Sequence, residues 1–245
     1  MTLLSTRQLQ RHFGGLRAVD GVDFDLAEGE IHALIGPNGA GKTTFVSLLS
    51  GRLEAQAGSI FFDGEDITHI PAYKRVQKGI AYTFQITSIY RNLTVFENVA
   101  LAAETGAKRS LKSETRSSIP DRVADILAQI GLDDKSAEIA GSLSYGHQRL
   151  LEVAMGLALA PRLLILDEPT QGLADIEIET FCTLLRDISS KVTILLIEHN
   201  MAVVMRVAEK ITVLNAGKVL ASGTPEDVRS NSAVQEAYLG GVSNA

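Results

Sequence analysis

The stretch Gly36-Pro37-Asn38-Gly39-Ala40-Gly41-Lys42-Thr43-Thr44 decides the fold of this 245-residue chain. Four residues separate its outer glycines, and a Lys-Thr pair follows the second one at once, which is the pattern of a phosphate-binding loop. The apolar run Ile31–Ile35 before the loop predicts a buried parallel strand. Residues 45–50 after it predict the first turns of a helix that ends near Gly51. This strand, loop and helix are the context that the motif requires.

The predicted ligand of the loop is a nucleoside triphosphate with Mg²⁺. Glycines let successive backbone amides face one anion, and the start of the following helix adds the positive end of its dipole. We expect Lys42 to neutralise the β- and γ-phosphates and the hydroxyl of Thr43 to ligate Mg²⁺. The alternative is a glycine-rich turn that binds nothing. The residues expected to contact the nucleotide here are Gly36, Pro37, Asn38, Gly39, Ala40, Gly41, Lys42, Thr43 and Thr44.

Composition limits the class of protein. The formal net charge of −6 argues against wholesale binding of nucleic acid. The single cysteine, Cys182, excludes an internal disulfide and suits a reducing compartment. The N-terminus does not have the pattern of a signal peptide, and no apolar run is long enough to span a membrane. We therefore expect a cytoplasmic protein whose membrane-spanning partners, if it has any, are other chains.

The order of elements predicts an α/β protein. Val22, Phe24 and Leu26 alternate with aspartates, which predicts a half-buried strand, and Phe13 falls in the turn before it. Further strands are expected over residues 59–62, 80–84, 163–166, 192–197, 211–214 and 218–222. Because helical segments separate most of these runs, the sheet should be parallel and covered on both faces.

Residues 86–160 predict a helical insertion into this core. Thr94 and Glu97 have the spacing of a capping box, a second helix should start at Asp121 and end at Gly131, and Ser144 should cap a third. Residues 105–118 predict an exposed connection or a weak helix. A last helix is expected from Thr224. The chain should thus be one domain, 1–245, with its core at 1–85 and 161–245.

A second acidic motif follows the apolar run Leu163–Leu166. Asp167 and Glu168 come at the end of this predicted strand, where open α/β sheets bind ligands. Asp167 would hold Mg²⁺ and Glu168 would polarise the attacking water. The alternative is a solvated turn.

Leu143-Ser144-Tyr145-Gly146-His147-Gln148 lies between the two motifs, at the start of a predicted helix. This hexapeptide resembles the signature motif of the ABC ATPases, which is usually Leu-Ser-Gly-Gly-Gln-Gln. The resemblance to that family covers essentially the whole chain. The resemblance implies a RecA-like P-loop NTPase core with an antiparallel β subdomain and a helical insertion. It also implies that Ser144 and Gly146 contact the γ-phosphate of an ATP molecule, as a hydroxyl and an amide at a helix N-terminus can do.

The resemblance assigns three further residues. Phe13 resembles the aromatic residue that stacks on adenine, although a lone Phe is more often part of the core. Gln85 resembles the glutamine that senses Mg²⁺ and the transporter subunit. His199 resembles the switch histidine that contacts the γ-phosphate and orients the water.

Three residues depart from the family pattern. Tyr145 and His147 replace signature residues, and Ala174 replaces an aspartate of the dimer interface, for which Asp175 is a partial substitute. Because of the last change, the resemblance does not imply the usual contact between subunits at Ala174.

The resemblance also implies partners. ABC ATPases act as head-to-tail dimers in which the phosphate loop of one subunit and the signature of the other hold each ATP, so the second subunit is a copy or a paralogue. Two membrane permeases, and indirectly a substrate-binding protein, complete such a transporter. Residues 86–92, just after Gln85, are the expected docking surface for the permeases, on the inner face of the membrane.

The signature with its tyrosine, the segment Tyr90–Val99, the run Ile197–Met201 and the C-terminal Ala237–Gly240 resemble the ATP-binding subunits of branched-chain amino acid importers. The alternatives are the same ATPase for urea or amide import, or for lipopolysaccharide export. A third possibility is a non-transport ABC ATPase, but such proteins usually have a long coiled-coil insertion or two cassettes, and this sequence has neither.

Overall fold

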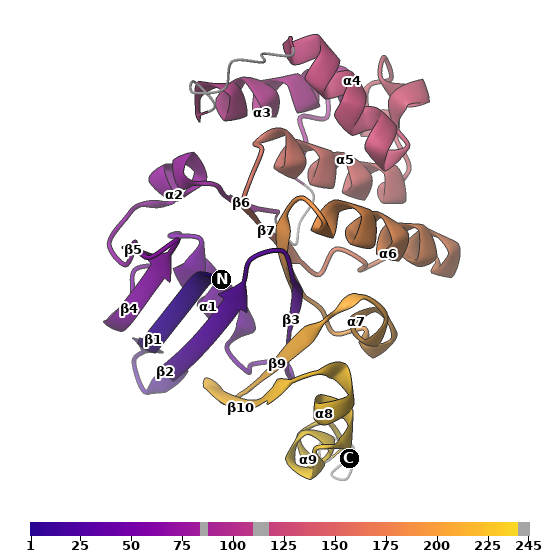
Figure 1. Cartoon of the computed structure of the whole chain (residues 1–245). Helices are drawn as coiled ribbons and strands as arrows, with labels where there is room; N and C mark the ends of the chain where they lie inside the picture. The colour runs from indigo at the N-terminus through magenta and orange to yellow at the C-terminus, as the bar shows by residue number, and fades with distance from the viewer. Residues whose placement is uncertain (84–87, 110–117, 240–245) are drawn as a thin grey trace. The chain divides into compact units, whose positions relative to one another are not determined.

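The computed structural model describes residues 1–83, 88–109 and 118–239, and the chain forms two compact units (Figure 1). The first unit contains Met1–Arg75 and the chain from Thr193 onward, and the second contains Val76–Val192. The phosphate loop therefore belongs to the first unit, and the acidic motif and the signature belong to the second.

An antiparallel sheet opens the first unit. Its strands are β1 (Thr2–Phe13), β2 (Leu16–Ala27), β4 (Ala57–Phe62) and β5 (Glu65–Asp66), in the order β2-β1-β4-β5. The apolar residues of β2 are buried and the aspartates between them are exposed, as the alternation predicts. This sheet confirms the predicted antiparallel β subdomain.

The second sheet of this unit is largely parallel. Strand β3 (Ile31–Ile35) pairs in parallel with β8 (Thr193–Ile197) and with β9 (Lys210–Asn215). Strand β10 (Lys218–Gly223) pairs antiparallel with β9. Helix α1 (Lys42–Leu49) follows the phosphate loop, and every residue of β3 is buried. The predicted strands and the helix that ends near Gly51 are confirmed.

Helices α7 (Met201–Val207), α8 (Pro225–Ser230) and α9 (Ser232–Leu239) complete this unit (Figure 1). The prediction of a single last helix from Thr224 is wrong. The side chain of Asn231 accepts hydrogen bonds from the backbone amides of Ala233 and Val234, so it caps a new helix. One apolar cluster joins β3 and β9 to these helices; it consists of Ala33, Ile35, Val204, Ala208, Ile211, Val213, Val228 and Val234.

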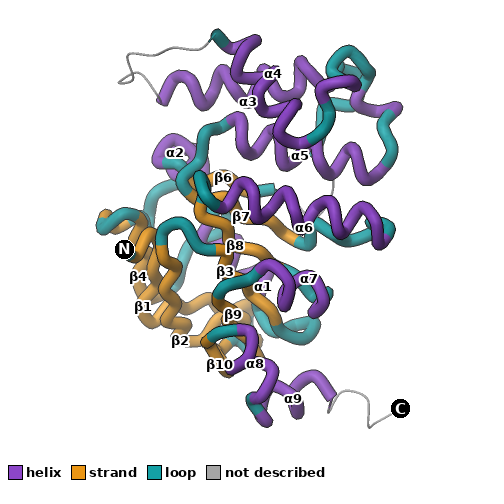
Figure 2. Tube along the Cα trace, turned by 45° about the vertical axis from the view of Figure 1, so that its right-hand side comes forward, coloured by secondary structure: helices purple, strands orange, loops and turns teal. Residues whose placement is uncertain are grey.

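In its described residues, the second unit combines a strand pair with four α-helices. Strand β6 (Ile80–Tyr82) pairs in parallel with β7 (Leu163–Asp167). Helices α3 (Val95–Arg109), α4 (Ile119–Ile130) and α5 (Tyr145–Ala158) pack against one another, and α6 (Asp175–Ser189) follows β7 (Figure 2). Short 3₁₀ turns cover Asp133–Lys135 and Ala140–Ser142. None of the helices in the described part of the chain is long and apolar enough to cross a membrane.

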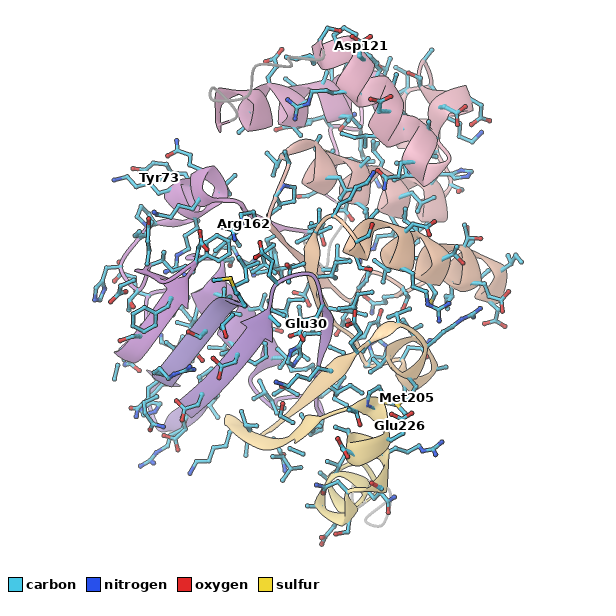
Figure 3. All side chains as sticks on the ribbon, in the orientation of Figure 1. Glu30, Tyr73, Asp121, Arg162, Met205 and Glu226 are labelled. Atoms are coloured by element: carbon cyan, nitrogen blue, oxygen red, sulfur yellow. The ribbon has the colours of Figure 1, made fainter. Side chains whose placement is uncertain are left out.

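Three predicted boundaries in this unit need correction. Strand β6 ends at Tyr82, two residues before the predicted end, which lies outside the described residues. Helix α3 continues through residues 105–109, so of the two predicted alternatives the helix is correct there and the exposed connection is wrong; residues 110–117 lie outside the described part. Helix α4 begins at Ile119, before Asp121, because Ser118 and Asp121 form a capping box; Figure 3 labels Asp121 at this end of the helix.

Helix α2 (Ala72–Lys78) contributes a buried cation to the first unit. Arg75 is 2% exposed, and its guanidinium donates to four carbonyl oxygens, those of Leu48, Leu49, Thr68 and Ile70. The first two are at the end of α1, where a helix leaves carbonyls without intrahelical donors. Burial lowers the pKa of Arg75 to about 10, so the side chain stays charged at neutral pH. Arg75 therefore fixes the end of the helix that begins at the phosphate loop.

We expect Arg75→Met to lower the free energy of unfolding by about 3 kcal/mol or more, since each buried carbonyl left without a donor costs about 1–3 kcal/mol. Urea denaturation followed by circular dichroism measures the loss. Lys74→Met, on the exposed side of the same helix, is the matched control. Equal stability of the two variants would contradict this role of Arg75.

Candidate functional site

The phosphate loop lies between β3 and α1, and its glycines are required by close backbone contacts. A Cβ atom at Gly36 would lie 2.2 Å from the carbonyl oxygen of Leu214, and one at Gly41 would lie 2.0 Å from that of Ala18. Both glycines have positive φ angles, of 152° and 100°. The loop is thus held by backbone on two sides, and no other residue type fits at these two positions.

Lys42 is the first residue of α1 and lies against the loop. It is 8% exposed, and its Nζ donates to the carbonyl oxygens of Gly36 at 2.6 Å and Pro37 at 3.1 Å. Its neighbour Thr43 is exposed, as is Asn38 in the loop. A buried ammonium beside a helix N-terminus is the chemistry that a phosphate group requires.

His199 lies at the same sheet edge as the phosphate loop. Strand β3 pairs in parallel with β8 so that Leu34 faces Ile197, and both strands therefore end side by side. The carboxylate of Glu198 is fully buried and accepts hydrogen bonds from the backbone amides of His199 and Asn200. It shapes the turn that leaves His199 exposed. This contribution of Glu198 is not visible in the sequence pattern.

Phe13 ends strand β1, so its prediction as part of a turn is wrong. The side chain is 45% exposed, and the guanidinium carbon of Arg11 lies 5.0 Å from the ring centroid. Phe13 is therefore an accessible aromatic ring and not part of the core. Its stacking on adenine stays a prediction.

The second unit holds the acidic motif at the end of β7. Asp167 is 3% exposed, and its carboxylate accepts a hydrogen bond of 2.6 Å from the hydroxyl of Tyr82 on the neighbouring strand. Carboxylate and hydroxyl oxygens are the ligand types that Mg²⁺ prefers, so Asp167, and Thr43 of the first unit, fit the predicted metal by their chemistry. Gln85, the third predicted ligand, lies outside the described residues.

Glu168 has an unusual backbone conformation. Its φ angle is 48°, in the left-handed region that residues other than glycine rarely adopt. Its carbonyl oxygen accepts hydrogen bonds from the side chain of Arg149 at 3.1 Å and from the backbone amide of Gln171 at 3.2 Å. Sequence reasoning identifies Glu168 but not Arg149, which comes from helix α5.

Helix α5 begins at the signature, as predicted. Ser144 is exposed and caps the helix by accepting from the backbone amide of His147, and its Oγ lies 3.1 Å from His147 Nδ1. Gly146 is buried beneath Glu177, whose Oε1 would be 2.2 Å from a Cβ atom at that position. Residues of this end of α5 and of α6 line a small pocket of about 150 Å³.

The unusual residues near the signature have contacts of their own. The ring of Tyr145 lies beside Gly172, with Cε1 3.0 Å from the Cβ position of that glycine. Ala174 precedes α6 and has no side-chain acceptor, but its backbone amide donates to the carboxylate of Glu177 at 2.8 Å. Glu177 therefore contacts both the signature glycine and the start of α6.

The fold and these residues define a phosphate-loop ATPase with a helical insertion. Residues 19–171 match the family described as ABC transporter, and residues 218–243 match the family described as branched-chain amino acid ATP-binding cassette transporter. The chain belongs to the ABC transporter family, as a subunit that binds and hydrolyses ATP. The resemblance seen in the sequence, and the fold that it implies, are confirmed.

Relatives match over nearly the whole chain. The chain is 38% identical to the high-affinity branched-chain amino acid transport ATP-binding protein BraF of Pseudomonas aeruginosa, over 97% of this chain and 98% of the relative. It is 39% identical, with the same coverage, to the corresponding protein LivG of Escherichia coli. A nucleotide-free ATP-binding cassette of an ABC transporter has a similar structure, with a TM-score of 0.86, 27% identity, and coverage of 97% and 99%.

We expect Lys42→Ala to weaken ATP binding at least about tenfold, because a charge-assisted hydrogen bond contributes about 1.5–3 kcal/mol. Titration with a fluorescent ATP analogue measures the dissociation constant. Lys74→Ala is the control for removal of a lysine at an exposed site. An unchanged affinity in a folded Lys42→Ala chain would argue against the phosphate cradle.

Proposed function

We propose that the chain powers an importer of branched-chain or other hydrophobic amino acids, bound to the inner face of the cell membrane. The observation that carries this proposal is the match of residues 218–243 to the branched-chain amino acid transporter family. The identities of 38–39% to BraF and LivG support it. The lipopolysaccharide export protein LptB of Haemophilus influenzae is 32% identical, so export of lipopolysaccharide is the competing outcome.

The proposed working form is a head-to-tail dimer. The phosphate loop would bind ATP together with Phe13, His199 and the acidic motif of its own chain, and Ser144 and Gly146 of a second subunit would complete the site. The exposed hydroxyl of Ser144, at a helix N-terminus, supports this role. Hydrolysis then depends on association, and closure and release of the dimer would move the permeases.

Glu168 is the proposed general base, with His199 orienting the attacking water. Glu168 is only partly buried, so its carboxylate can reach water, whereas Asp167 is buried and oriented by Tyr82. Mg²⁺, when bound by Thr43, Asp167 and Gln85, would neutralise charge on the phosphates. The division of roles between the two acids follows from their different environments.

Tyr90 is the centre of the proposed docking surface for the permeases. Its ring is 56% exposed, while the buried side chain of Asn98 bonds both its backbone amide and its carbonyl. The backbone of residues 91–93 is bonded to that of residues 140–141, next to the exposed side chain of Ile139. An exposed aromatic residue on a fixed backbone is typical of an interface anchor. Residues 84–87, including part of the predicted surface, lie outside the described residues.

We expect Glu168→Gln to bind ATP but to hydrolyse it at least about a hundredfold more slowly, since a general base contributes about 10²–10⁴-fold to the rate. ATP should then hold the variant as a dimer, which light scattering after size-exclusion chromatography detects. Glu179→Gln, on the exposed part of α6, is the control. Hydrolysis at the parent rate would exclude Glu168 as the base.

The transport proposal is tested in the assembled complex. We expect the chain to co-purify with two membrane permeases, and its ATPase rate to rise with a binding protein loaded with leucine, isoleucine or valine. Tyr90→Asp should abolish co-purification, because a buried unpaired charge opposes docking. Tyr73→Asp, at an exposed tyrosine on α2 (Figure 3), should not. If urea or lipopolysaccharide raised the ATPase rate and the amino acids did not, the proposed cargo would be wrong.

A further inference from the structure

Arg149 connects the signature helix to the acidic motif. It lies in the second turn of α5, five residues after Ser144, and is 2% exposed. Its Nη1 donates to Glu152 at 2.6 Å, and its Nη2 donates to the main-chain carbonyl oxygen of Glu168 at 3.1 Å. Two different nitrogens of the rigid guanidinium hold these two acceptors, whereas an ammonium presents all of its donors from one nitrogen.

The carbonyl of Glu168 is the part of this residue that needs support. A left-handed φ angle at a residue other than glycine persists only when its surroundings fix it. Two donors, Arg149 Nη2 and the amide of Gln171, fix the orientation of this carbonyl. The direction in which the Glu168 side chain leaves the backbone is therefore set from α5.

Glu152 extends the connection to a third segment. It is 5% exposed, and it also accepts a hydrogen bond from the backbone amide of Ser88, the first described residue after the segment that contains Gln85. Burial raises the pKa of Glu152, against the opposing effect of its bonds to Ser88 and Arg149. A buried ion pair adds little to the stability of a fold, because the cost of desolvating both charges offsets their attraction. What the pair of Arg149 and Glu152 does provide is a fixed position for the guanidinium.

We propose that Arg149 is a positioning residue for ATP hydrolysis, which holds the backbone of Glu168 so that its carboxylate meets the attacking water. Glu152, which accepts hydrogen bonds from both Arg149 and the backbone amide of Ser88, connects the guanidinium to that segment. The inference rests on the proposed role of Glu168 as general base. Because Ser144 and Arg149 belong to one helix, a displacement of the signature would move the base.

Arg149→Lys separates positioning from charge. The single nitrogen of lysine can still pair with Glu152, but it cannot also occupy the position of Nη2, from which the arginine holds the carbonyl of Glu168. We expect kcat to fall about 10- to 100-fold with KM for ATP changed less than about twofold, since small misplacements of a catalytic group reduce the rate by such factors. Arg186→Gln, which removes an exposed arginine from α6, is the control and should keep the parent kcat.

The two variants are combined to test the route of the effect. If Arg149 acts through Glu168, adding Arg149→Lys to Glu168→Gln should lower the residual rate by less than about twofold. A purely structural role would lower the rate of the double variant by the same factor as that of the single one. Full additivity, or a parent kcat in a folded Arg149→Lys chain, would overturn the proposal.

Glu152→Gln provides a second measurement if Arg149→Lys does not fold. Ser88 and Arg149 donate to different oxygens of Glu152, and the amide has only one acceptor oxygen, so the change removes one of these bonds together with the charge. We therefore expect kcat to fall at least about threefold with KM little changed. An unchanged kcat would overturn the link. If Glu168→Gln itself hydrolyses ATP at the parent rate, the assignment of the base fails and this proposal with it; a slow Glu168→Gln beside a normal Arg149→Lys overturns the positioning role alone.

Discussion

Close backbone contacts around the phosphate loop constrain the whole first unit. The carbonyl of Leu214 in β9 and that of Ala18 in β2 approach the loop so closely that only glycine fits at the two contact points. The amide of Gly217, in the turn between β9 and β10, also donates to the carbonyl of Ala40. The loop is thus where the antiparallel and the parallel sheets of this unit meet. A shift in the register of β2 or β9 would move the backbone that contacts the loop. Bulkier parts of the strand could then occupy the space in which the loop lies.

Local signals explain why much of the fold could be predicted. The loop glycines, the capping box of Thr94 and Glu97, and the alternation in β2 act over a few residues, and the elements that they predict are present. Boundaries fail where the deciding residue lies just outside the pattern, as Ser118 does for α4 and Asn231 does for the last two helices. Caps of this kind are selected by single side chains that also occur in loops.

Contacts between distant positions could not be predicted. Arg75 reaches carbonyls at the end of α1, 26 and 27 residues earlier, and Arg149 reaches Glu168, just after β7 and 19 residues later. In the sequence both arginines are charged residues of helices, a type that usually faces solvent. The motif residues themselves, such as Lys42 and Asp167, could be identified because their spacing is set by the nucleotide and not by the rest of the core.

The position of Glu177 affects how variants of the signature are interpreted. Its carboxylate covers Gly146 and at the same time bonds the amide of Ala174 at the start of α6. Any side chain at residue 146 must displace this carboxylate, and α6 then loses one of the acceptors at its N-terminus. A loss of activity in Gly146→Ala would therefore combine two effects, the altered signature and a released helix end. Glu177→Gln keeps an acceptor for the amide of Ala174 and a side chain of the same size above Gly146. It would therefore show whether the charge of Glu177 matters apart from its packing on the glycine.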